Sequence, residues 1–197
     1  MRTSKLLIGA FALLVPGAAS AEDTLVAGYP VSASFGGGVM GFTDSTTRDF
    51  ATEGGTWEAR VGFNTTGIVA VEAAYVGSLQ NIDALGLDNN ATLLGTGVEA
   101  NVRINFLEGN LQPYALVGGG WTRFDLSTTT NTSDVSGYDN VATVPMGVGI
   151  GYRIDDLLLD LRGTYRATSG ADLIANQSAD EARLDSWSAT LRAGFQF

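Results

Sequence analysis

The stretch Trp187 to Phe197, WSATLRAGFQF, carries the clearest structural signal in the chain. Its apolar residues occupy every second position, and the positions between them hold polar or very small residues. Successive side chains of a β-strand point to opposite faces, so this period predicts a strand with one apolar face. A half-buried strand of a soluble sandwich would carry the same alternation. The stretch therefore predicts a strand without saying what its apolar face contacts.

The same alternation recurs along the rest of the chain. Five further segments place apolar residues at every second position: Gly55 to Phe63, Ile68 to Gly77, Ala91 to Phe106, Val141 to Arg153 and Leu157 to Thr168. Two more segments, Val31 to Phe42 and Leu111 to Leu126, also read as strands, and each contains a glycine triplet. The sequence thus predicts an all-β chain of eight strands, arranged as an antiparallel up-and-down barrel.

The facing of the two glycine-containing strands stays open at this level. Phe35 and Phe42 are seven residues apart, as are Tyr114 and Trp121. Residues an odd number of positions apart lie on opposite faces of a regular strand, so either pair could share a face only with a bulge. Glycines often accompany bulges, which leaves both registers undecided.

Connections between the predicted strands alternate strictly in length. The long ones are rich in Ser, Thr, Asn and Asp and cover Thr43 to Gly54, Ser78 to Asn90, Ser127 to Asn140 and Ser169 to Leu184. The short ones cover Asn64 to Gly67, Leu107 to Asn110 and Ile154 to Asp156. Short periplasmic turns and long exterior loops are typical of bacterial outer-membrane barrels. A soluble meander has no physical reason to keep all long loops at one end.

The first residues have the layout of a secretory signal. Arg2 and Lys5 give a positive start, an apolar stretch follows to Val15, and small residues lead to Ala19 and Ala21. We expect cleavage after Ala21. An uncleaved anchor is the alternative, but the apolar stretch has only about 10 residues where a spanning helix needs about 20. The predicted organisation is a signal over 1–21, a short leader over 22–30 and a transmembrane barrel domain over 31–197.

Ionisable residues on the polar faces of the strands indicate which face is inside. Four acids and five arginines occupy these faces: Glu58, Arg60, Glu72, Glu99, Arg103, Asp160, Arg162, Arg166 and Arg192. The whole chain has 21 acidic and 11 basic residues, so this set is close to balanced within an acidic protein. We therefore expect an interior ion-pair network and an apolar exterior that faces lipid. A solvated face of a soluble sheet would also carry charges, but its signs would not need to balance.

Composition excludes several functional classes. The chain has no histidine and no cysteine, and its only lysine, Lys5, lies in the predicted signal. The common nucleophile systems built on His, Cys or Lys cannot form, so the sequence predicts no enzyme and no catalytic residue. It also predicts no cofactor and no metal site. Loss of Arg2 and Lys5 moves the formal net charge from −10 to −12, and such an acidic chain is not expected to bind nucleic acid.

At this point the chain resembles a known family. Trp187, Leu191, Phe195 and the terminal Phe197 resemble the C-terminal assembly signal of outer-membrane proteins. Together with the signal and eight strands, they resemble the small OmpA/OmpX-type barrels, with OmpW-like proteins as a second choice. The resemblance implies outer-membrane lipid and the outer-membrane assembly machinery as partners. An OmpW-like relative would imply a narrow pathway for small apolar molecules.

Two functional classes follow from these predictions. The first is a structural or surface-interaction barrel, with a side-chain-filled interior and long polar loops that could meet an extracellular partner. The second is a narrow channel or ligand-binding barrel for small molecules, because inward glycines of Val141 to Arg153 could leave a gap beside the charges. Either would reside in the outer membrane of a Gram-negative bacterium, as a porin-like or structural protein.

Overall fold

The structure is a computed structural model of the full chain, and it describes residues 31–44, 47, 53–64, 68–82, 91–107, 109–127, 138–169 and 184–197. The expected signal over 1–21, with Ala19 and Ala21, and the leader over 22–30 lie outside the described residues. Everything that follows concerns the described part of the chain.

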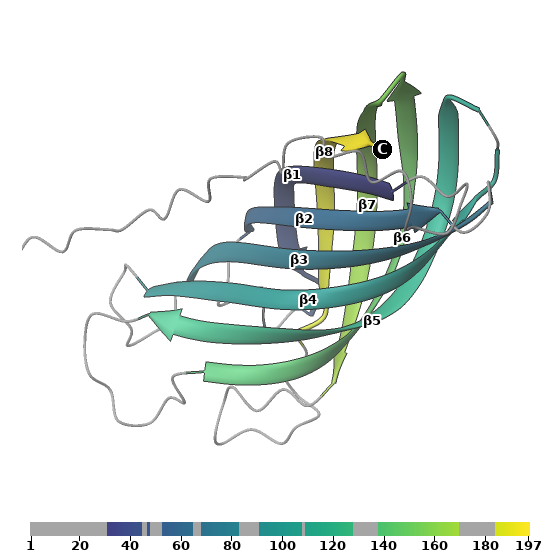
Figure 1. Ribbon diagram of the computed structural model, residues 1–197. Helices are drawn as coiled ribbons and strands as arrows, with labels where there is room; N and C mark the ends of the chain where they lie inside the picture. Colours follow the sequence, from purple (N-terminus) through teal and green to yellow (C-terminus); the bar gives the residue numbers. More distant parts are fainter. Residues whose placement is uncertain are drawn as a thin grey trace, which may run out of the picture.

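Eight β-strands make up the domain. They are β1 (Val31–Phe42), β2 (Gly54–Asn64), β3 (Val69–Ile82), β4 (Ala91–Asn105), β5 (Leu111–Ser127), β6 (Tyr138–Ile154), β7 (Leu157–Ser169) and β8 (Ser186–Gln196). Each strand pairs antiparallel with its neighbours in the sequence, and β1 also pairs with β8, so the sheet closes into a barrel (Figure 1). The predicted eight-stranded up-and-down barrel is confirmed. Within the described ranges, no helix is long and apolar enough to cross a membrane.

The stagger of the strands follows from their registers. One line of paired residues runs once around the barrel through Val31, Phe63, Val71, Val102, Val117, Met146, Tyr165, Trp187 and Gly41. The line returns to β1 ten residues beyond its start, which is the shear of the barrel. With a rise of about 3.3 Å per residue and about 4.8 Å between strands, this shear tilts the strands by about 40°.

The two faces of the sheet have opposite character. Outward positions carry the exposed large apolar side chains, such as Val98, Val148 and Leu191, each more than half exposed. Inward positions in the middle of the barrel carry the buried charged and polar side chains. At a tilt of about 40°, the apolar side of β8 is about 25 Å high, which matches the lipid-facing band of outer-membrane barrels. The apolar residues of the alternation therefore form the outer face of the barrel.

Both strands whose facing was open are regular. In β1, Phe35 is 53% exposed and Phe42 only 1%, and in β5, Trp121 is 53% exposed and Tyr114 only 1%. The registers of β1 with β2 and of β4 with β5 continue without a shift. Neither aromatic pair shares a face, so no bulge is needed. The glycine triplets instead provide space inside the barrel, as described below.

Two strands extend beyond their predicted ends. Residues 78–82 were expected in a loop but continue β3, where Gln80 pairs with Leu93 of β4. Residues 138–140 likewise begin β6 and pair with β5. These extensions consist mostly of polar residues, and backbone hydrogen bonds to a neighbouring strand do not depend on an apolar alternation. The sheet around β3 to β6 therefore reaches further at the long-connection end than the sequence indicated.

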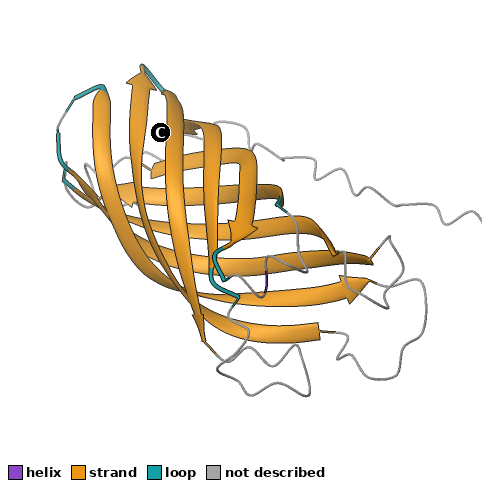
Figure 2. Cartoon of the chain, turned by 180° about the vertical axis from the view of Figure 1, so that it is seen from behind, coloured by secondary structure: helices purple, strands orange, loops and turns teal. Residues whose placement is uncertain are grey.

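The tight turns lie at the other end of the barrel (Figure 2). Between β6 and β7 the chain turns through Asp155 and Asp156, and Asp155 adopts a positive φ of 50°. Aspartate tolerates this left-handed conformation better than most residues. Between β4 and β5, Gly109 has a φ of 118°, which only glycine adopts readily. Both residues permit short returns between neighbouring strands at this end of the barrel.

Candidate functional site

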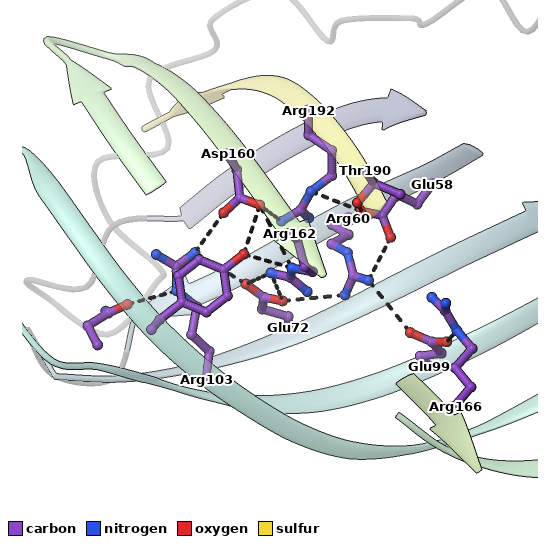
Figure 3. Close-up of polar contacts among 12 residues, drawn as sticks. Glu58, Arg60, Glu72, Glu99, Arg103, Asp160, Arg162, Arg166, Thr190 and Arg192 are labelled. Carbon is purple, nitrogen blue, oxygen red and sulfur yellow. Dashed lines mark hydrogen bonds and ion pairs between the residues drawn. The ribbon is translucent and has the colours of Figure 1, made fainter. Parts of the chain in front are cut away.

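The centre of the barrel contains a network of charged side chains (Figure 3). All nine ionisable residues named from the sequence point inward, and none is more than 7% exposed. They come from β2, β3, β4, β7 and β8 and form ten ion pairs with one another. The structure thus brings together in one cluster residues that lie up to 134 positions apart, from Glu58 to Arg192. We call this cluster the ion-pair network.

Glu72 on β3 has three arginine partners. Arg162 donates from Nη2 to both carboxylate oxygens, at 3.0 and 2.8 Å. Arg60 and Arg103 approach the same carboxylate through their Nη1 atoms at 3.4 and 3.5 Å. The contact with Arg162 crosses the lumen from β7 to β3, so the network joins opposite walls of the barrel.

Asp160 on β7 is a second point where several strands meet. Arg192 of β8 donates to its Oδ1, and Arg103 of β4 lies 3.5 Å from its Oδ2. The hydroxyl of Tyr114, on β5, also donates to Oδ1 at 2.8 Å. Charged residues of three strands and a phenol from a fourth therefore meet at one carboxylate.

Glu58 and Glu99 extend the network toward the long-connection end. Glu58 pairs with Arg60 at 2.7 Å and with Arg192 at 3.0 Å, and it also accepts a hydrogen bond from Thr190. Glu99 pairs with Arg166 at 2.6 Å and lies 3.6 Å from Arg60. Each of the four acids has at least two arginine partners, so no carboxylate depends on a single contact.

Tyr114 belongs to the network, although sequence reasoning did not name it. Its ring lies under the guanidinium of Arg103, 3.8 Å from the ring centroid, and its hydroxyl accepts from Nε of Arg162 at 2.8 Å. A cation over an aromatic face is attracted by the ring quadrupole, more strongly when the pair is buried. The signal for Tyr114 was its odd spacing from Trp121, which assigns the two residues to opposite faces.

Glycines on the strands that carry no network charge provide room for these long side chains. A Cβ on Gly36 of β1 would overlap the side chain of Arg192, and a Cβ on Gly149 of β6 would overlap the ring of Tyr114. The predicted gap beside the inward glycines of β6 is thus occupied. On β5, a Cβ on Gly118 would likewise overlap Asn101, and one on Gly120 would lie 3.0 Å from the side chain of Glu99.

The energetics of the network explain why its pairs occur together. Removing a charge from water costs several kcal/mol per ion, which a partner at contact distance offsets only when the remaining hydrogen bonds are also made. Every arginine of the network except Arg166 reaches more than one carboxylate, and Arg166 pairs with Glu99 and donates to Ser188. The network is close to neutral, with five guanidinium groups and four carboxylates. Its chemistry is that of a rigid filling, because every carboxylate is engaged by arginine.

Above the network, the interior changes character near the long connections. Five buried apolar side chains form a cluster there, which we call the outer cluster: Phe42, Leu93, Phe124, Val141 and Leu184. A cavity of about 30 Å³ separates this cluster from the network. The sequence did not identify this cluster, and the facing of Phe42 and Phe124 was open because both lie on strands with glycine triplets. No strand contributes more than one member, so the cluster does not change the alternation of apolar and polar residues along any strand.

The residues of the proposed assembly signal lie on the outside of β8 or just after it. Leu191, Phe195 and Phe197 are 63%, 58% and 76% exposed, and Trp187 is half-buried. Among the described residues there is no group of three or more acidic side chains that could hold a metal ion. The two distinctive features of the described residues are therefore the filled lumen and the apolar outer wall.

Comparison with known protein families agrees with the barrel architecture. Residues 7–197 match the family described as "Outer membrane protein beta-barrel domain". The chain belongs to this outer-membrane barrel family. The match confirms the resemblance to small eight-stranded outer-membrane barrels. No curated protein matches the chain.

Several solved outer-membrane barrels share the fold at low identity. Neisserial surface protein A is 13% identical with a TM-score of 0.55, over 86% of this chain and 97% of that chain. Ail, the attachment invasion locus protein of Yersinia pestis, is 13% identical with a TM-score of 0.51, over 86% and 97%. A major outer membrane protein from Thermus thermophilus is 13% identical with a TM-score of 0.51, over 86% and 99%. At this identity the likeness concerns the fold alone.

Proposed function

We propose that this outer-membrane barrel is a closed, non-enzymatic protein of the Gram-negative outer membrane, with a structural or surface-interaction role. In this proposal a cleaved signal directs export, the outer-membrane assembly machinery inserts the barrel, and lipid surrounds its apolar wall. The long connections then face the exterior and are available to an extracellular partner.

The filled lumen is the observation that carries the proposal. Ion pairs join opposite walls at mid-height, and the cavity between the network and the outer cluster measures only about 30 Å³. A water molecule needs about 10–15 Å³ of such volume, so this space holds about two waters. Eight-stranded barrels are just wide enough for their side chains to fill them. Passage of solutes would require the network to rearrange.

The alternative of a narrow channel depended on space beside the inward glycines. Tyr114 lies over Gly149, and the guanidinium of Arg103 would be 3.0 Å from a Cβ on Gly151. These contacts fill the space that a pathway would use. The alternative therefore has no feature of the described lumen in its favour, whereas the closed barrel has the network and the outer cluster.

Planar-bilayer recording of the purified, refolded barrel tests the proposal. We expect no reproducible unitary conductance above background, with a known porin recorded in parallel to show that the bilayer reports pores. A shift in gel mobility between boiled and unboiled samples would show that the barrel is folded before each recording.

A reproducible conductance would contradict the closed barrel if it depends on the lumen. The matched variants are Arg162→Gln, inside the network, and Arg123→Gln, on the outer surface, where the Arg123 side chain is 50% exposed. A conductance that changes with Arg162→Gln and stays unchanged with Arg123→Gln would establish a pathway through the network. The proposal would then be replaced by the narrow channel.

A further inference from the structure

The outer cluster occupies the mouth of the barrel at the long-connection end. Phe42 is the last residue of β1, Leu184 lies two residues before β8, and Val141 is near the start of β6. All five members are between 0 and 5% exposed, and all belong to the inward side of the wall. The cluster is therefore an interior feature, whereas large apolar side chains such as Val98, Val148 and Leu191 face outward.

Members of the cluster come from strands on different sides of the barrel. β1 and β5 are not neighbours in the sheet, yet the rings of Phe42 and Phe124 lie 6.4 Å apart between centroids. Leu93 of β4 and Val141 of β6 flank Phe124 through the pairing of β5 with both strands. The side chains thus meet across the lumen and close it.

Between the outer cluster and the ion-pair network lies the small cavity. Phe124 of the cluster and Arg166 of the network both line it, so it lies between the two groups. Six hydroxyl side chains also line it: Thr56, Ser78, Thr122, Thr143, Thr168 and Ser186. The hydroxyl of Thr143 is buried and has no hydrogen-bond partner among the described residues. Most of the lining surface is apolar, but the hydroxyl groups, one of them unpaired, offer polar partners to ordered water.

We propose that the outer cluster is a second seal, independent of the ion-pair network, and that the cavity is a hydrated chamber that lies between the two seals. An apolar constriction excludes ions and water because they would lose hydration there without gaining polar contacts. The ion-pair network blocks the lumen for a different reason, since its charges fill the cross-section and bind one another. The inference rests on the proposed function, because two seals have a role only in a closed barrel.

Cysteine accessibility tests the second seal directly, because the chain contains no cysteine. Thr143→Cys would place the only thiol of the protein in the chamber, where a charged methanethiosulfonate reagent must pass a seal to reach it. We expect slow modification with the outer cluster intact, and modification about tenfold faster or more when Phe42→Ala and Phe124→Ala are added. Phe124→Ala alone is the milder variant if the triple variant does not fold. Gel mobility before and after boiling would verify folding in every case.

The matched control removes two phenyl groups from the lipid-facing side instead. Phe35→Ala with Phe195→Ala should leave the rate at Thr143→Cys unchanged, because both residues face outward. Fast modification with the cluster intact would overturn the inference, as would an unchanged rate in both cluster variants. Neither result would make the wild-type barrel conduct, so failure of the second seal is distinguishable from failure of the closed-barrel proposal.

Discussion

Tyr114 shows how one inward side chain depends on the residue opposite it. It pairs in register with Gly149 of β6, and its ring occupies the space where a larger residue at 149 would place its Cβ. The same ring contacts Arg103, and its hydroxyl connects Asp160 with Arg162. The absence of a side chain at Gly149 therefore leaves room for the Tyr114 ring, and Tyr114 in turn contacts three members of the ion-pair network.

We expect Gly149→Ala to lower the free energy of unfolding by about 1–3 kcal/mol, since the new methyl group overlaps the Tyr114 ring and forces it to shift. The measurement is urea unfolding of the barrel in lipid vesicles. Gly119→Ala is the matched control, because Gly119 faces outward and its Cβ would meet nothing within 4 Å. Equal stability of both variants would show that Tyr114 moves without cost.

At the scale of elements, the ion-pair network connects strands that are not neighbours in the sheet. Arg162 on β7 and Glu72 on β3 are separated by three strands in either direction around the barrel, yet they form two hydrogen bonds. Backbone pairing cannot link these walls directly, so the side chains provide the cross-connection. The strands are therefore coupled through the lumen as well as through the sheet.

A double-mutant cycle should measure this coupling. Arg162→Ala and Glu72→Ala should each cost about 3–5 kcal/mol, because each leaves an uncompensated buried charge. The double variant should cost less than the two single effects together, by about 1–3 kcal/mol, because neither charge remains. Urea unfolding in vesicles gives all four free energies.

The pair Arg123 and Asp125 provides the comparison for that cycle. Their side chains are 50% and 38% exposed, and they form an ion pair at 2.9 Å on the outer surface. Exposed pairs contribute about 0–1 kcal/mol, so the equivalent cycle should show little coupling. Strictly additive effects for Arg162 and Glu72 would mean that the network does not connect the two walls.

Much of this element-level structure was predictable from residue patterns. The alternation located six of the strands, because an outward side chain in lipid and an inward side chain in the lumen must differ in polarity, whereas the facing of β1 and β5 stayed open. It did not locate the outer ends of β3 and β6, where Gln80 and Asn140 continue the sheet through backbone pairing alone. It also missed Tyr114 and the outer cluster. Inward residues such as Phe124 and outward ones such as Trp121 are both aromatic, and only the register distinguishes them.

At the scale of the whole molecule, the barrel presents one continuous apolar wall around a charged interior. On β6, outward side chains are apolar from Ala142 to Ile154, and Val148, at the middle of this run, is 65% exposed. The height of this wall determines how the molecule sits in a bilayer. Substitutions on the wall should therefore have effects that depend on depth.

We expect Val148→Arg to lower the free energy of unfolding in vesicles by about 2–4 kcal/mol, because the charge would lie near the bilayer midplane. Asn140→Arg, on the same strand but at the long-connection end, should cost only about 0–1 kcal/mol. Similar costs at both positions would contradict the lipid-facing orientation of β6, because a solvated face would accept arginine at either position.

The seam between the first and last strands also has a kinetic consequence. β1 pairs with β8 along its length, and Val31 and Phe197 exchange backbone hydrogen bonds at 3.2 and 2.7 Å. Within the described part of the chain, no two contacting residues are further apart in sequence. Such contacts form slowly, because the long segment between the two residues must lose conformational entropy before the contact can form. Until the seam closes, β1 and β8 each expose an unpaired edge that could pair with another chain. Closure of this one pair of strands is therefore the step at which folding competes with aggregation.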